Sequence, residues 1–532
     1  MSLRNRFALL TIAVLYLAFL AGCGSSTHSP VPPPSGGFSN ADFSGTYTFS
    51  IAGEDIDAAD SPSPFVMSGS FTACGCTAGT LSAGSVDVSD FSGTGSGLAI
   101  NTTGSGYSIS QDGRGKVDLS ITTSSGNIPI VLDLVLTSSS HGLVSRFDSG
   151  GTGSGTIDLQ PSPVTLSTSP YAFSLSGTDL KGDPLSTVGA FTLSSSGSIS
   201  AGVEDFNDDA TPAFESSISG SVTVGSGTAP GTATLDTGFG NLTFDVYAID
   251  AAHLKLIESD GLAILMGDVF AQPSATIPSG TLVFTMTGLD PTGAPFAAGG
   301  TVSSDGASQL TNGAEDFNDA GSVDGNTSPA VPTSFNGTFV ASPSGSGRFQ
   351  VALSGFAGGT NFVAYPSSGG VLILEADSGL NAGVTDGAAM TQTTGASLSA
   401  SEGYGLNLTG VDLTSDYELD EIGQFNTTSS GMSGLLDLND FTVSNPSTSN
   451  LTGSYTPSSN SAQGSATFDN QGVFYYAVDG STVLLLSTDS TDVSVGTFEE
   501  QTTPSAASAD IAQRHLATLK SVPRPRASHR SR

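Results

Sequence analysis

The 532-residue chain is strongly acidic, with 49 Asp and Glu residues against 14 Lys and Arg residues and a formal net charge of −35. Such a surface repels nucleic acid and anionic lipid headgroups, so neither is expected as a partner of the body of the protein. Only three cysteines are present, so disulfides do not define the fold.

The first 23 residues combine two arginines with an uncharged run and end in a cysteine. Arg4 and Arg6 precede an uncharged run over residues 7–22, which is too short for a membrane-spanning helix of about 20 residues. The run ends in Leu-Ala-Gly-Cys, which resembles the lipobox that signal peptidase cuts before a lipid-modified cysteine. The resemblance implies that Cys23 becomes an acylated N-terminus that attaches the protein to a membrane. An ordinary cleaved secretory signal is the alternative.

The residues after Cys23 predict where the anchored protein resides. Gly24, rather than Asp, follows the cysteine, and by the same resemblance this favours the outer membrane over the inner membrane. Residues 24–41 are rich in Pro, Ser and Gly, which is typical of a semi-rigid, solvated spacer. We therefore expect an exported protein of the cell envelope, whose envelope or extracellular partner the sequence does not specify.

Four copies of one unit follow the spacer, with a period of roughly 115 residues. Each copy contains Asp, an apolar residue, Ser or Asn, and Asp in succession, beginning at Asp87, Asp205, Asp316 and Asp437. A late Asp and a Gln keep the same phase, at Asp148 and Gln160, Asp260 and Gln272, Asp377 and Gln392, and Asp489 and Gln501. These markers predict units over 42–160, 169–272, 279–392 and 401–501, followed by a basic, disordered tail over 502–532.

Within each unit the apolar residues alternate with polar ones, which predicts β-strands. The first strand has one apolar face in every copy: Tyr47, Phe49 and Ile51, then Tyr171, Phe173 and Leu175, then Leu282, Phe284 and Met286, then Tyr404, Leu406 and Leu408. A Gly-x-apolar signal follows at Gly69/Phe71, Gly189/Phe191, Gly300/Val302 and Gly423/Phe425. No segment after the signal has the apolar stripe of an amphipathic helix, so the fold class is all-β.

Each unit contains about eight short strands with connections too short for crossovers, which predicts an antiparallel meander. Such a meander can remove its edges by closing into a small barrel, and a two-sheet β-sandwich is the alternative. The Gly-x-Tyr-x-Phe pattern of the first strand resembles that of lipocalins and avidin-like proteins, in architecture only. The whole chain resembles uncharacterised tandem-repeat, β-rich lipoproteins of soil bacteria.

The recurring acids predict one acidic rim on each unit, because the first, third and seventh strands of a meander end on the same side. Carboxylate and amide oxygens are suitable calcium ligands, so Glu204, Asp205, Asn207 and Asp208 are candidates for a weak, local Ca²⁺ site in the second unit. The alternative is that these Asp and Asn residues only form turns.

No familiar catalytic motif is present, so we expect no enzymatic activity and no tightly bound cofactor. His141 and His253 occupy the same phase in two units and are interpreted as structural residues at strand starts. Cys74 and Cys76 flank one glycine, and in an exported protein they are expected to form a local disulfide; an exchangeable redox bond is the alternative.

These observations favour a non-enzymatic, membrane-anchored lipoprotein that presents four β-units for binding, adhesion or envelope structure. The alternative is a lipocalin-like carrier, because an eight-stranded barrel can enclose one small apolar ligand.

Overall fold

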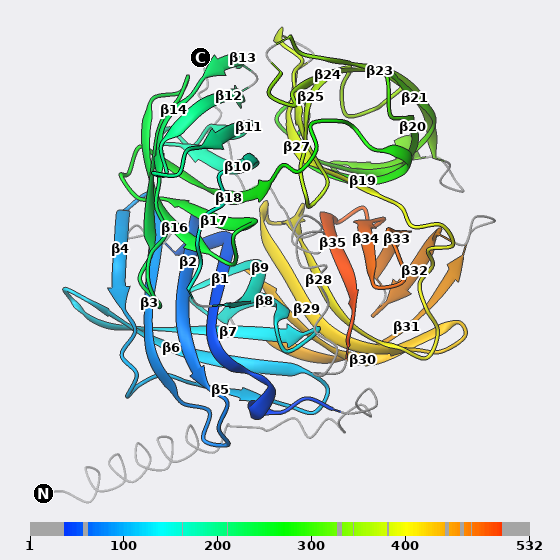
Figure 1. The fold of residues 1–532 in the computed structure, drawn as a ribbon. Helices are drawn as coiled ribbons and strands as arrows, with labels where there is room; N and C mark the ends of the chain where they lie inside the picture. The colour runs from blue at the N-terminus through cyan, green and yellow to red at the C-terminus, as the bar shows by residue number, and fades with distance from the viewer. Residues whose placement is uncertain are drawn as a thin grey trace, which may run out of the picture. The chain divides into compact units, whose positions relative to one another are not determined.

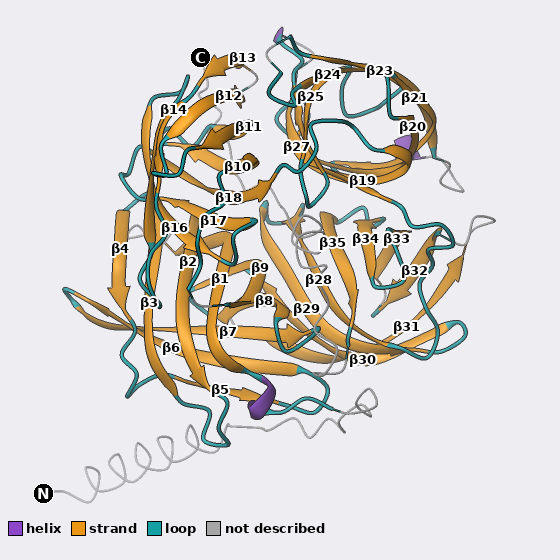
Figure 2. Cartoon of the chain, in the orientation of Figure 1, coloured by secondary structure: helices purple, strands orange, loops and turns teal. Residues whose placement is uncertain are grey.

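The computed structural model describes residues 37–56, 62–161, 163–209, 211–326, 332–343, 345–379, 382–441, 446–457, 462–469 and 471–502. Cys23, the first part of the spacer and nearly all of the basic tail lie outside these residues. The described residues belong to one compact body. Strands dominate its described part (Figure 2), where the helices are the short 3-10 turns η1 (Asn40–Asp42) and η2 (Asp324–Asn326). None of the described helices is long and apolar enough to cross a membrane.

The described strands form four consecutive antiparallel sheets, which we call units 1 to 4 (Figure 1). Unit 1 contains β1 (Ser44–Ile56), β2 (Pro62–Cys74), β3 (Leu81–Asp90), β4 (Gly93–Ala99), β5 (Gly106–Ile109), β6 (Arg114–Thr123), β7 (Gly126–Leu136), β8 (His141–Asp148) and β9 (Gly151–Gln160). Unit 2 contains β10 (Pro170–Asp179), β11 (Pro184–Leu193), β12 (Ile199–Asp208), β13 (Thr211–Ser217), β14 (Ser219–Val222), β15 (Gly231–Asp236), β16 (Asn241–Ala248), β17 (His253–Glu258) and β18 (Ala263–Ala271).

The second half of the chain repeats this order. Unit 3 contains β19 (Ser279–Leu289), β20 (Pro295–Asp305), β21 (Gln309–Asp319), β22 (Ser322–Val323), β23 (Thr333–Ala341), β24 (Phe349–Ser354), β25 (Asn361–Pro366), β26 (Val371–Glu375) and β27 (Val384–Thr391). Unit 4 contains β28 (Gly403–Asp412), β29 (Tyr417–Thr427), β30 (Gly431–Asp440), β31 (Ser447–Pro457), β32 (Gln463–Phe468), β33 (Gln471–Ala477), β34 (Thr482–Ser487) and β35 (Asp492–Glu500).

The predicted all-β meander is confirmed in every unit. The first strand pairs with the last, as β1 with β9, β10 with β18, β19 with β27, and β28 with β35, so each sheet curls back on itself as a barrel does. Unit 4 is a closed eight-stranded barrel, and pairing of β20 with β21 closes unit 3, whose strands are seen nearly end-on in Figure 1. The sheets of units 1 and 2 are closed by isolated bridges between described residues, Thr80↔Gly106 and Ile100↔Ile121 in unit 1 and Ser198↔Ser221 in unit 2.

The open sheets arise because the fourth strand of the meander is divided. In unit 4 this strand is continuous, since β31 pairs with both β30 and β32. In unit 1, β4 forms a ladder with β3, and a separate strand, β5, forms a ladder with β6. The interruption contains Asn101, whose side-chain oxygen accepts a hydrogen bond from Thr103 N at 3.1 Å. Such a turn offers the backbone an alternative to ladder pairing, so the strand breaks there.

Alternate residues of each strand point into the unit that the strand builds. Tyr47, Phe49 and Ile51 of β1 are fully buried in the interior of unit 1, as the alternation predicts. Several residues on the outer faces are buried as well, and Val203 of unit 2 belongs to one apolar cluster with Tyr365 of unit 3. Sheets that are buried on both faces must pack against other sheets, so the units contact one another directly.

Candidate functional site

The recurring glutamines make the same contact between neighbouring units four times. Each Gln side chain donates from Nε2 to a backbone carbonyl at the end of the sixth meander strand of the next unit, which is β7, β16, β25 or β33. The donor and acceptor residues are Gln160 and Ala248, Gln272 and Pro366, Gln392 and Ala477, and Gln501 and Leu136, at 2.5, 3.0, 2.8 and 2.9 Å. Unit 1 therefore contacts unit 2, unit 2 contacts unit 3, unit 3 contacts unit 4, and unit 4 contacts unit 1. We call this closed series the contact cycle.

The third residue of the repeated Asp-containing string makes a second matched contact. In three units it is an Asn, whose side-chain Nδ2 donates to carbonyls in or beside the turn before the last strand of the next unit. Asn207 binds Glu375 and Gly383, Asn318 binds Ser487, Asp489 and Asp492, and Asn439 binds Arg146, Asp148 and Gly151. These amides supply hydrogen-bond donors to backbone carbonyls across each interface.

The first Asp of the string makes a buried ion pair at the interface between units 2 and 3. Asp205 and Arg348 are 0% and 1% exposed at their side chains, and Arg348 Nε lies 2.7 Å from Asp205 Oδ2. Arg348 Nη2 also donates to Asp205 Oδ1 at 2.7 Å, and the Tyr365 hydroxyl donates to Oδ2 at 2.5 Å. At the next interface the Tyr476 hydroxyl donates to Asp316 at 2.5 Å.

The structure does not bring Glu204, Asp205, Asn207 and Asp208 together at one point. Asp205 and Asn207 point toward unit 3, where their partners are Arg348 and backbone carbonyls. Glu204 lies on the opposite face of β12, where its carboxyl group accepts a hydrogen bond from the Thr187 hydroxyl at 2.9 Å. Burial raises the pKa of the Asp208 carboxyl group. Successive strand residues alternate between faces, so the four side chains do not converge. Within the described ranges no group of three or more His, Cys, Asp or Glu residues could hold a metal ion.

Other acids that recur in the units do form turns, as the alternative interpretation predicts. Asp179, Asp290 and Asp412, each two residues after a Gly at the end of the first strand of units 2, 3 and 4, accept a hydrogen bond from the backbone N–H two residues later. The late Asp of each unit accepts from a backbone N–H in or just before the sixth meander strand, as Asp260 does from Thr243 N at 2.6 Å. The acidic markers therefore have structural explanations within the fold.

Cys74 and Cys76 are joined by a disulfide across the turn between β2 and β3, with their Cα atoms 5.2 Å apart. Gly75 between them has a φ of 62°, which a glycine adopts without strain. Its backbone N–H donates to the Tyr107 hydroxyl at 2.9 Å, which ties the turn to the neighbouring β5. The bond is thus local to unit 1.

His141 lies at the interface between units 1 and 4. It is the first residue of β8, as predicted, and its Nδ1 lies 2.7 Å from Asp158 Oδ1 while its Nε2 lies 3.0 Å from Glu499 Oε2. Burial lowers the pKa of His141, but the charges of Glu499 and Asp158 outweigh this effect and raise the pKa to about 9. A protonated His141 therefore links two buried carboxylates across the interface.

Sequence reasoning missed the basic partners in these interfaces. Arg114 binds Asp437 across units 1 and 4, Lys255 donates to Thr156 across units 2 and 1, and Arg348 binds Asp205. The signal that could have identified them is their scarcity in an acidic chain. Between residues 24 and 509 the only Lys and Arg residues are Arg114, Lys116, Arg146, Lys181, Lys255 and Arg348.

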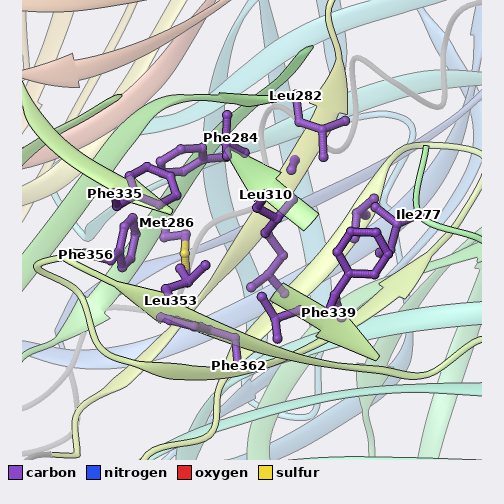
Figure 3. Close-up of a pocket in the computed structure, with 16 residues that line it drawn as sticks. Ile277, Leu282, Phe284, Met286, Leu310, Phe335, Phe339, Leu353, Phe356 and Phe362 are labelled. Carbon is purple, nitrogen blue, oxygen red and sulfur yellow. The ribbon is translucent and has the colours of Figure 1, made fainter. Parts of the chain in front are cut away.

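The interior of unit 3 contains an apolar cavity of about 70 Å³ (Figure 3). All sixteen lining residues are Ile, Leu, Val, Ala, Met or Phe. Phe284, Phe335 and Phe356 gather at one end, with ring centroids 5.1 to 5.9 Å apart, and Ile277 and Phe339 lie at the other. The cavity offers contact to an apolar group and no side-chain hydrogen bond.

No protein-family model and no curated protein matches this chain. Among solved structures, similarity is found to a variant of the vaccine antigen transferrin-binding protein B from Haemophilus parasuis Hp5, at 9% identity and a TM-score of 0.16, over 68% of this chain and 83% of that chain. The intact protein Ap-TbpB, with N and C lobes, is similar at 10% identity and a TM-score of 0.19, over 68% and 84%. The fold defines the class, an all-β protein of tandem barrel-like units, and the contact cycle characterises this particular chain.

Proposed function

We propose that the protein is a non-enzymatic, lipid-anchored scaffold of the cell envelope. Its four units act as one rigid body that presents a continuous surface to an envelope or extracellular partner. Acylated Cys23 would supply the anchor, and the outer membrane is the expected location. The negative charge of the body repels nucleic acid, so nucleic acid is not expected as that partner.

The observation that carries the proposal is the Gln501 contact, which links unit 4 back to unit 1. Its Nε2 donates to the Asp112 and Leu136 carbonyls, and its Oε1 accepts from Gln424 Nε2 at 3.1 Å. Units that were joined only by flexible linkers would need no such contact between the last unit and the first. A closed cycle instead limits the motion of each unit by two neighbours, which suits a scaffold that holds binding surfaces at fixed spacing.

Replacing Gln501 by Ala tests this rigidity. We expect faster amide hydrogen exchange in β7 and β28 on both sides of the interface, because two buried carbonyls lose their donor at a cost of about 1–3 kcal/mol. Exchange in β11 and β26, which lie in units 2 and 3, should change little. The measurement is hydrogen exchange followed by mass spectrometry on the full chain.

Gln350 on β24 is exposed and provides the matched control, since Gln350→Ala removes the same side chain from outside the interfaces. If Gln501→Ala and Gln350→Ala give the same exchange in β7 and β28, units 4 and 1 are not held by this contact. The rigid-scaffold proposal would then be wrong.

The anchor is tested by replacing Cys23 with Ser. We expect loss of metabolic labelling with a fatty-acid analogue, because the thiol that would carry the lipid is absent. Recovery of the protein in alkaline-washed outer membranes should also fall severalfold. Cys74→Ser is the matched control, because it removes a thiol that is engaged in the disulfide of unit 1. Labelling of the Cys23→Ser chain at the wild-type level would contradict the lipoprotein assignment.

A further inference from the structure

Three of the four units close one end of their interior with an aromatic pair on the first two strands. The pairs lie opposite each other in register and are Tyr47 with Phe71, Tyr171 with Phe191, and Tyr404 with Phe425. In unit 2 the two rings stack with centroids 5.8 Å apart, and in unit 4 with centroids 5.6 Å apart.

The tyrosines of these pairs are fixed by their hydroxyl groups. Each donates to a backbone carbonyl in the turn between the sixth and seventh meander strands of its own unit. Tyr47 binds Ser139 at 2.6 Å, Tyr171 binds Ala251 at 2.8 Å, and Tyr404 binds Gly480 at 3.2 Å. The same closure is therefore built three times from the same two residue types.

Unit 3 departs from this rule at both positions. Its register pair is Leu282 with Val302, so two aliphatic side chains stand where the other units have a Tyr and a Phe. Both residues line the cavity of unit 3. Interiors normally pack without such voids, and the smaller pair leaves space that the aromatic pair fills elsewhere.

We propose that this cavity is a binding site for a small, uncharged hydrocarbon group, either a free molecule or the end of an alkyl chain. Apolar cavities that are lined in this way stay dry and take up apolar ligands, and a cavity of about 150 Å³ accepts benzene. The cavity of about 70 Å³ in unit 3 therefore fits a smaller group of a few carbon atoms. Because the lining has no polar side chain, a charged or hydrogen-bonding ligand would lose its hydration without replacement.

This inference concerns unit 3 alone and does not depend on the scaffold function. It departs from a carrier in which every unit holds a ligand, since units 1, 2 and 4 keep the aromatic pair. It also assigns roles to two residues that the repeat pattern marks as divergent, Leu282 and Val302.

The test restores the aromatic pair in unit 3. The variants Leu282→Tyr and Val302→Phe are compared with the wild-type full chain by xenon-129 NMR, and by thermal melts with n-butane or 1-octanol in solution. We expect the wild-type chain to shift the xenon resonance and to melt higher with butane. Both effects should weaken about tenfold or more in each variant, because the added ring occupies the site. Val340→Phe, at a residue that is 64% exposed, adds the same ring outside the cavity and should change neither effect.

The two alkyl probes separate the possible sources of the ligand. A melting shift with butane alone assigns the site to free small molecules, whereas a shift with 1-octanol as well assigns it to the ends of longer chains. If a filled variant fails to fold, the reciprocal change Tyr404→Leu with Phe425→Val should create a new xenon site in unit 4. Equal xenon shifts in the wild-type chain and in every folded Leu282 or Val302 variant would overturn the proposal, as would the absence of any shift in the wild-type chain.

Discussion

Replacing Arg348 by Met is expected to destabilise the folded chain by about 3–5 kcal/mol, because a buried carboxylate loses its only cation. Asp205 has no exposed side-chain area, and two guanidinium nitrogens bind it at 2.7 Å. The variant should show a lower denaturation midpoint in urea, followed by circular dichroism. The loss should concern units 2 and 3 first, since these residues join them.

Two comparisons make this prediction specific. Lys181→Met removes a cation from Asp179, but Lys181 is 75% exposed at its side chain, so little change in stability is expected there. The double variant Arg348→Met with Asp205→Asn removes both charges and should recover much of the loss, while Tyr365 keeps an acceptor. Equal midpoints for Arg348→Met and Lys181→Met would show that the buried pair does not hold the interface.

The folded chain is expected to be more stable near pH 5 than near pH 8. Burial raises the pKa values of eight carboxyl groups from ordinary values of 3.8 or 4.5 to about 7 or about 8. These groups are Glu54, Asp87, Asp133, Glu258, Glu315, Asp316, Glu375 and Glu421. Between pH 5 and pH 8 the folded chain therefore binds more protons than the unfolded chain, and stability falls as the pH rises.

His141 changes stability in the same direction. Its pKa is raised from 6.5 to about 9, so its contribution is fully present below pH 6.5 and is lost as the pH rises through 9. The lowered pKa values of Asp179 and Asp377 act oppositely, but their contributions are lost only as the pH falls below the ordinary carboxyl range. The raised pKa values therefore decide the direction of the change between pH 5 and pH 8, which is a loss of stability as the pH rises.

Thermal melts at constant ionic strength measure this dependence. Glu421→Gln is the informative variant, because it replaces a buried carboxyl group, whose pKa burial raises to about 8, with a neutral amide. Its melting temperature should fall less between pH 5 and pH 8 than that of the wild-type chain. A wild-type melting temperature that is constant or rises over this range would contradict the assignment of protonated carboxyl groups to the folded state.

The recurring Gln and Asn residues show where prediction from sequence reaches its limit. Their phase revealed four units, because a marker such as Gln160 or Gln501 can be recognised without knowing its partner. Their role could not be inferred, because Gln501 binds a carbonyl 365 positions away and Arg348 binds an acid 143 positions away. The prediction of an acidic rim from the strand ends considered each unit separately. In the structure, however, the Asp205 and Asn207 side chains point out of unit 2 into unit 3.

The sequence by itself determined the all-β class, the four repeats and the inward faces such as Tyr47, Phe49 and Ile51, because strand alternation is a local property that survives in any packing. The sequence also contains Leu282 and Val302 in unit 3 at the positions where the other units have a Tyr and a Phe. Only the tertiary structure decided that the recurring polar residues close a contact cycle and that this difference in unit 3 leaves a cavity. The physical reason is that contacts between units, and the volume left inside one, depend on side chains from many strands at once, which no local pattern records.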